Sequence, residues 1–138
     1  MKLLSVLLII CFSTKLFSQD ITKYNVICTS IALFKDGELK KSTTYSASRE
    51  IIYSKDLEYI KISYPEENSS DFFTLGKIFD SDVEDGYSKI YQKSYLKNSS
   101  KEEAFIFYWK NNKLIKIQRC FTDIGTLFVT TFDIVNPN

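Results

Sequence analysis

The sequence predicts an all-β fold: an antiparallel meander of about 8–9 strands, closed into a barrel or folded as a two-sheet sandwich, after an N-terminal signal peptide. Short runs rich in β-branched and aromatic residues alternate with polar turns along most of the chain. Repeated strand–helix units, which indicate a parallel α/β sheet, are missing from the pattern. The 138 residues, of which 44% are hydrophobic and 25% charged, suit one globular domain.

The N-terminus is typical of a secretory signal peptide. A lysine precedes an apolar run at residues 3–12, and a more polar segment follows. This run is too short to cross a bilayer, so we expect no transmembrane anchor in the mature chain. We expect residues 1–18 to be removed by cleavage near Ser18/Gln19. Residues 19–138 then form a single β-rich globular domain that is secreted, periplasmic or associated with the cell envelope.

Charge and composition exclude several classes of function. Loss of Lys2 and Lys15 with the signal peptide changes the formal charge from +1 to about −1. A nearly neutral domain lacks the basic surface that binds duplex nucleic acid. The chain contains no histidine, so imidazole cannot serve as a base or a metal ligand. We therefore expect no cofactor, no metal site and no assembled catalytic set.

The strands are predicted from period-two alternation and from the turns between them. Asp36-Gly37 and Asn111-Asn112 are residues that accept the positive φ of tight hairpin turns. Residues 65–71 form a polar loop and residues 80–86 an acidic loop. The expected strands are 22–34, 39–46, 51–53, 57–64, 72–79, 87–96, 103–110, 113–121 and 126–135.

Tyrosines and lysines alternate in the segment 87–96, and their spacing fits two structures. The tyrosines lie four residues apart, as on one face of a helix, but strand-forming neighbours favour a strand. In a strand they share one side with the lysines, which would let the rings stack on sugars or bases beside the ammonium groups. The same pattern also arises where tyrosines cover a sheet and lysines prevent edge-to-edge pairing. This Tyr–Lys ribbon consists of Tyr87, Lys89, Tyr91, Lys93 and Tyr95.

A second aromatic group lies on one face of the segment 103–110. Phe105, Phe107 and Trp109 occupy alternate positions, and large apolar side chains on one face of a strand usually pack inward. If this face lines the mouth of a barrel, Trp109 becomes a ligand contact. The predicted ligand-binding residues are therefore the Tyr–Lys ribbon and Trp109.

Two cysteines, Cys28 and Cys120, remain once the signal peptide with Cys11 is removed. An even number of cysteines in an oxidising compartment is compatible with a disulfide bond. Two separate thiols that pack as small apolar side chains fit the sequence equally well. Both interpretations stay open at this point.

The acidic segment 80–86 resembles half of a calcium-binding loop. An EF-hand loop needs glycine at its sixth position and an acid at its twelfth, where this chain has Asp85 and Tyr91. An irregular calcium site, a carboxylate pair for glycoside hydrolysis and an exposed acidic turn are the remaining interpretations. The acids concerned are Asp80, Asp82, Glu84 and Asp85.

The sequence thus favours an exported, non-enzymatic β-domain that binds an unknown ligand or protein partner, or has a structural role. One alternative is a hydrolase that acts on carbohydrate through carboxylates alone. The other is an extracellular module stabilised by calcium. Because histidine is missing and no motif places a base beside a nucleophile, the enzyme hypothesis is the weaker one.

Overall fold

The computed structural model describes residues 21–137 as antiparallel β-strands with one short 3-10 helix. The signal peptide predicted at residues 1–18 and its cleavage site lie outside the described residues. Residues 21–137 contain no helix with the length and apolar character of a membrane span. The elements are β1 (Ile21–Lys35), β2 (Glu38–Ser54), β3 (Tyr59–Tyr64), η1 (Pro65–Glu67), β4 (Ser69–Glu84), β5 (Tyr87–Leu96), β6 (Glu102–Lys110), β7 (Lys113–Asp123) and β8 (Thr126–Ile134).

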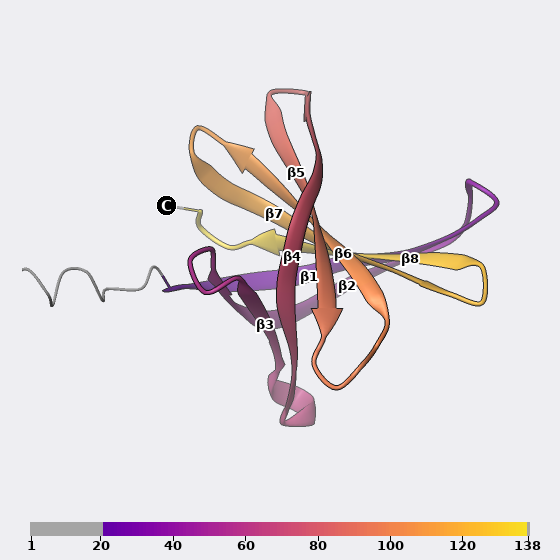
Figure 1. Ribbon diagram of the computed structural model, residues 1–138, viewed down its shortest axis with the longest axis horizontal. Coiled ribbons are helices and arrows are strands. Elements are labelled where there is room, and N and C mark those ends of the chain that lie inside the picture. Colours follow the sequence, from indigo (N-terminus) through magenta and orange to yellow (C-terminus); the bar gives the residue numbers. More distant parts are fainter. Residues whose placement is uncertain (1–20, 138) are drawn as a thin grey trace, which may run out of the picture.

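Each strand pairs with its neighbour in sequence, and β8 pairs back with β1, so the sheet closes on itself as a barrel (Figure 1). The predicted all-β antiparallel meander is confirmed. Several boundaries differ from the prediction; the expected loop 65–71, for example, ends early because β4 begins at Ser69. The expected strands 39–46 and 51–53 are one strand, β2, because both segments pair with β1. The expected loop 80–86 is wrong for residues 80–84, since β4 continues to Glu84 opposite β5 and only Asp85 and Gly86 form the turn.

The alternating strand directions give the closed sheet two distinct ends. The β2–β3, β4–β5 and β6–β7 turns lie at one end, and the β1–β2, β3–β4, β5–β6 and β7–β8 connections lie at the other. In Figure 1 the β4–β5 turn is at the top of the view and η1 is at the bottom. Side chains near the turns therefore line one opening or the other.

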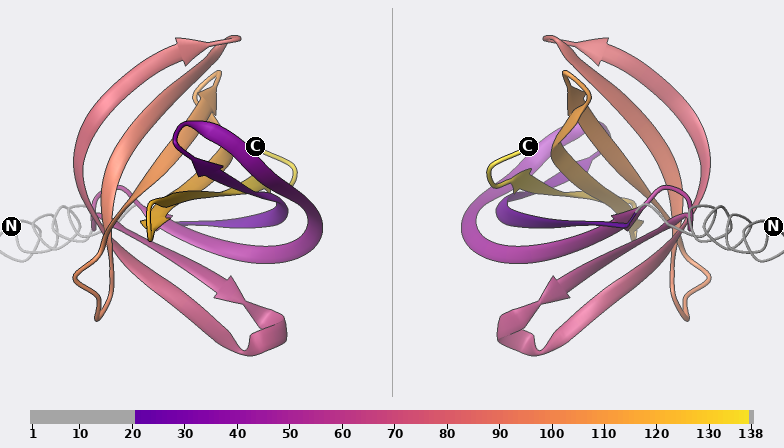
Figure 2. Two further views of the ribbon diagram at one scale, coloured as in Figure 1. Left: turned by 90° about the vertical axis from the view of Figure 1, so that its right-hand side faces the viewer. Right: turned by 90° about the vertical axis from the view of Figure 1, so that its left-hand side faces the viewer.

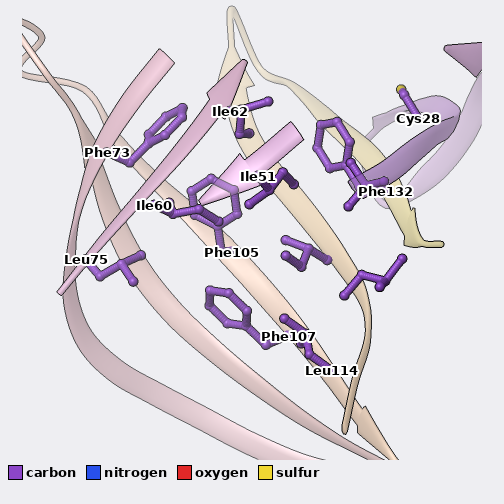
Figure 3. Close-up of a cluster of buried hydrophobic side chains, with 13 residues drawn as sticks. Cys28, Ile51, Ile60, Ile62, Phe73, Leu75, Phe105, Phe107, Leu114 and Phe132 are labelled. Atoms are coloured by element: carbon purple, nitrogen blue, oxygen red, sulfur yellow. The ribbon is translucent and has the colours of Figure 1, made fainter. Parts of the chain in front are cut away.

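Apolar side chains fill the middle of the closed sheet. Successive side chains of a strand point to opposite faces, so every second residue enters the interior. Figure 3 shows Ile51, Ile60 and Phe105 converging between the strands. The phenyl rings of Phe73 and Phe105 meet edge to face, with 5.0 Å between their centroids. The buried core consists of Val26, Cys28, Ile51, Ile60, Ile62, Phe73, Leu75, Phe105, Phe107, Leu114, Ile117, Phe132 and Ile134.

β4 is irregular where it passes the first of these ends. Its register against β5 shifts between Leu75 and Ile78 and again between Ile78 and Asp80. A β-bulge bends its strand and increases the local twist. In Figure 2 the β4–β5 hairpin arches away from the rest of the sheet. Ile78 and Phe79 are each 49% exposed as a result.

Four of the hairpins have two-residue turns with positive φ at both positions. Asp36-Gly37, Asp85-Gly86 and Asn111-Asn112 use residues that tolerate this conformation. The β7–β8 turn instead has Ile124 at φ 46°, followed by Gly125 at 73°. A β-branched residue in the left-handed region is a steric outlier. Because Ile124 is 95% exposed, packing does not compensate for this strain.

We expect Ile124→Asn to stabilise the protein by about 1 kcal/mol, since asparagine relieves most of the left-handed backbone cost. Urea unfolding of the two proteins measures the difference. The reverse change at the equivalent turn position, Asn111→Ile, serves as the matched control and should destabilise by a similar amount. Equal stability of wild type and Ile124→Asn would contradict the strain argument.

Candidate ligand-binding site

A cleft of about 510 Å³ lies at the end of the closed sheet that carries the β2–β3 and β6–β7 turns. We call it the tryptophan cleft, because the single tryptophan of the chain is in its wall. It lies above the core residue Phe107 and includes side chains of β2, β4, β5 and β6. The lining residues are Tyr53, Lys55, Glu58, Ile78, Ser88, Ile90, Gln92, Phe107, Trp109 and Asn112.

Aromatic rings form one wall of the cleft. Phe107 is buried, and Tyr53 and Trp109 are half-buried against the core. The ring centroids of Tyr53 and Phe107 are 5.0 Å apart, with 31° between the planes. Aromatic pairs at this distance attract each other beyond the effect of the area they bury. The wall is therefore held in place before any ligand arrives.

The polar rim of the cleft comes mainly from the β2–β3 turn. The Ser54 side chain is fully buried, and its Oγ accepts a hydrogen bond of 3.1 Å from the Leu57 amide. The Leu75 amide of β4 donates to the Glu58 carbonyl at 2.7 Å, which ties the turn to the neighbouring strand. These bonds fix the positions from which Lys55 and Glu58 reach the cleft.

The bulge in β4 supplies the opposite side of the cleft. At Gly76 a Cβ atom would lie 3.0 Å from the ring of Tyr95, so this close approach favours glycine. The Gly76 carbonyl accepts a hydrogen bond of 2.9 Å from Gln92 Nε2. The same bulge brings Ile78 to the rim. One backbone irregularity therefore places both an apolar and an amide side chain.

The structure separates the two parts of the predicted ligand-binding set. Trp109 lines the cleft, as expected if its face of β6 borders a mouth. The segment 87–96 is a strand, β5, and not the alternative helix. Ile90 and Gln92 of β5 point toward the cleft, so the ribbon residues Tyr87, Lys89, Tyr91, Lys93 and Tyr95 lie on the outer face.

The lysines of the Tyr–Lys ribbon are paired with acids on the outer face. Lys89 forms an ion pair with Glu84, and Lys93 Nζ lies 2.9 Å from Glu102. The hydrogen bond to Glu84 raises the pKa of Lys89. Tyr91 Oη donates to Asp82 at 3.5 Å. Ligand binding by this ribbon stays a prediction.

The acidic segment belongs to this outer face as well. Asp80, Asp82 and Glu84 of β4 stand opposite Tyr91, Lys89 and Tyr87 of β5, so the acids and the ribbon form a cross-strand ladder. Opposite charges on neighbouring strands stabilise their pairing. Within the described residues, no group of three or more acids or cysteines is arranged to hold a metal ion.

A charged cluster is buried at the other end of the closed sheet. Arg119 donates from Nε and Nη2 to both carboxylate oxygens of Glu103, at 2.8 and 2.9 Å. Its Nη1 donates to Asp71 at 3.2 Å, and Tyr64 Oη donates to the same carboxylate at 3.0 Å. Burial and the adjacent Asp71 carboxylate raise the pKa of the Tyr64 phenol. The Arg119 guanidinium also stacks on Phe73, 4.8 Å from the ring centroid.

The two cysteines are free thiols, so the disulfide interpretation is not supported. Cys28 is buried in the core, whereas Cys120 pairs with Ala104 on the outer face of β7. Their side chains therefore leave the sheet on opposite sides. Burial raises the pKa of Cys28, and burial together with Glu103 raises the pKa of Cys120 to about 11.

The sequence alone did not identify Tyr53 and Gln92 as residues of the cleft, and it did not identify the charged cluster around Arg119. Gln92 lies on the inner face of β5, which also carries the polar residues Ser88 and Ser94. The rarity of arginine could have pointed to the charged cluster. Of the 18 basic residues, only Arg49 and Arg119 are arginines, and both lie at this charged end. Arginine is preferred over lysine for buried ion pairs.

The chain matches no protein-family model, no curated protein and no solved structure.

We expect Arg119→Met to destabilise the protein by about 3–4 kcal/mol, because it leaves Glu103, which is 8% exposed, as a buried unpaired charge. The double variant Arg119→Met/Glu103→Leu should recover a large part of this loss. Urea unfolding measures both. The exposed pair Lys40–Glu38 provides the control, since Lys40→Met should change stability by less than about 0.5 kcal/mol. Equal losses in the single and double variants would contradict the argument.

Stability should fall as the pH rises from 9 to 11. The unfolded Cys120 thiol ionises near its ordinary pKa of 9.0, whereas the folded thiol keeps its proton to about 11. Its contribution is therefore complete below pH 9 and is lost through pH 11, by about 2 kcal/mol. In Cys120→Ala the decline should be correspondingly shallower. Urea unfolding at several pH values tests this, and identical slopes in the two proteins would refute it.

Proposed function

We propose that the protein is an exported, non-enzymatic β-domain that binds an uncharged, mostly apolar small molecule in the tryptophan cleft. The observation that carries the proposal is the aromatic cleft of about 510 Å³ at one end of the closed sheet. Small-molecule sites generally have volumes of about 300–1,000 Å³, with apolar walls and a few polar groups. Export is inferred from the apolar run at residues 3–12, which lies outside the described residues.

The chemistry of the lining indicates the character of the ligand. Trp109, Tyr53 and Phe107 offer flat apolar faces, while Ser88, Gln92 and Asn112 offer hydroxyl and amide groups for hydrogen bonds. Lys55 and Glu58 contribute opposite charges, so the rim has no net charge. A neutral molecule with an extended apolar part and one or two polar groups suits this lining best.

The cleft gives less support to a carbohydrate hydrolase. Two carboxyl groups about 5–10 Å apart are needed across the substrate. Among the lining residues, Glu58 is the one carboxylate. Asp82 and Glu84 lie on the outer face, where they contact Tyr91 and Lys89. Ligand binding therefore accounts for the geometry better than hydrolysis does.

We expect the neutral fluorophore N-phenyl-1-naphthylamine to bind in the cleft and to quench the emission of Trp109, the single tryptophan of the chain. Gln92→Leu should alter the affinity, and Phe107→Ala should weaken it at least about tenfold because the aromatic wall is lost. The titration follows both the protein emission and the probe emission.

Matched changes on the outer face distinguish the cleft from the Tyr–Lys ribbon. Tyr91→Phe and Lys93→Met remove ribbon contacts without touching the cleft, and both should leave probe affinity unchanged. If these variants weaken binding while Phe107→Ala does not, the ribbon is the binding surface and the proposal fails. Far-ultraviolet circular dichroism of each variant confirms that the sheet remains intact.

A further inference from the structure

The charged end of the closed sheet contains a second cavity, of about 360 Å³. We call it the arginine cavity. Its walls are mainly apolar and come from β1, β7 and β8, including Ile31, Phe121, Phe128 and Phe132. The rings of Phe121 and Phe128 stack with 4.9 Å between centroids and 4° between planes. Its polar groups come from Arg49, Tyr64, Arg119 and Thr130.

Arg119 already has its anionic partners. Its guanidinium holds both oxygens of Glu103 and one oxygen of Asp71, so the charges of this group sum to −1 without any ligand. The side chain is also fixed between aromatic rings, 4.8 Å from Phe73 and 5.1 Å from Phe121. An incoming anion would have to displace a buried carboxylate, which is energetically unfavourable. Arg119 therefore shapes the cavity but is a poor anion receptor.

Arg49 is in a different position, because its partner is at the surface. Its Nη2 lies 2.6 Å from Glu66 of η1, while its side chain is 15% exposed and that of Glu66 is 50% exposed. Arg49 Nη1 donates to the Ser48 carbonyl at 2.9 Å, and the guanidinium lies 5.2 Å from the ring centroid of Tyr64. The arginine is thus held at the cavity, while its counter-ion stands in water.

We propose that the arginine cavity binds a single-chain amphiphile with a carboxylate head, and that this head replaces Glu66 as the partner of Arg49. The apolar tail then lies against Phe121, Phe128 and Phe132. Arginine suits this role because its planar guanidinium pairs with a carboxylate through two parallel hydrogen bonds. Glu66 acts as an internal competitor: it satisfies Arg49 in the free protein and moves into solvent when the ligand enters.

This second site is independent of the tryptophan cleft. The two cavities lie at opposite ends of the closed sheet, and Phe105, Ile117 and the other core side chains fill the space between them. Their preferences also differ, since the cleft has no net charge at its rim and the arginine cavity presents a cation with an exchangeable partner.

Calorimetric titration with decanoate, decanol and decyltrimethylammonium tests the proposal. We expect decanoate to bind most tightly and decyltrimethylammonium most weakly. Glu66→Gln should raise the affinity for decanoate about fivefold, because the competing anion is removed. The adjacent change Glu67→Gln is the matched control: Glu67 accepts a hydrogen bond from Ser69 at 3.4 Å and should leave the affinity unchanged.

Arg49→Met should reduce decanoate affinity at least about tenfold, because the carboxylate loses its cationic partner. Trp109→Phe should leave decanoate binding unchanged, which separates this site from the tryptophan cleft. The proposal is overturned if decanoate shows no binding, if it binds no more tightly than decyltrimethylammonium, or if Glu66→Gln fails to strengthen it. Because Glu66 is half-exposed, its substitution tests the proposal even if Arg49→Met does not fold.

Discussion

Closure of the sheet by the pairing of β1 with β8 is the constraint on which the other features depend. Once the ring of strands is closed, each strand has one face toward the interior and one toward the outside, and alternation assigns each side chain to one of them. Eight strands enclose a space that side chains just fill, and the buried aromatic and branched residues occupy its middle. Both cavities lie near the ends of the strands, away from this filled middle.

Polar groups near the apolar interior find their partners in different ways at the two ends of the closed sheet. At the tryptophan cleft, amides, hydroxyls and rim charges border the opening, where water or a ligand can reach them. At the arginine cavity, full charges lie deeper and must satisfy one another, as Arg119 does with Glu103 and Asp71. A buried ion pair of this kind adds little net stability but makes its members costly to separate. Arg119 therefore keeps its two carboxylate partners, and Arg49 is the arginine whose partner a ligand can replace.

Local chemistry carried much of the fold prediction. Asp36-Gly37 and Asn111-Asn112 identified hairpin turns from the φ angles that these residues accept, and period-two alternation identified most strands. The acidic segment 80–86 was predicted as a loop because its composition is polar. Residues 80–84 are instead part of a strand, because β5 offers tyrosines and lysines opposite the acids. Which residues of β5 lie opposite the acids depends on the register between β4 and β5, and the composition of the segment does not reveal that register. In the charged cluster, Glu103 and Arg119 come from the paired strands β6 and β7, whereas Asp71 comes from β4, which does not pair with either, so its contact with Arg119 depends on the curvature of the whole sheet.

The tryptophan cleft is built by the backbone rather than left by imperfect packing. A packing defect in a core is costly and tends to collapse, since its lining loses contacts without gaining any. Here the regular pairing of β4 with β5 is interrupted at Gly76, and the Gly76 carbonyl accepts a hydrogen bond from Gln92 instead. The same interruption places Ile78 at the rim of the cleft. Glycine occupies position 76, where a Cβ atom would press on the ring of Tyr95. Bulges gather at barrel rims and beside functional sites, and this one widens the opening beside the aromatic wall. Trp109 could be recognised from its place on an apolar face, but the position of Ile78 at the rim of the cleft follows from the bulge.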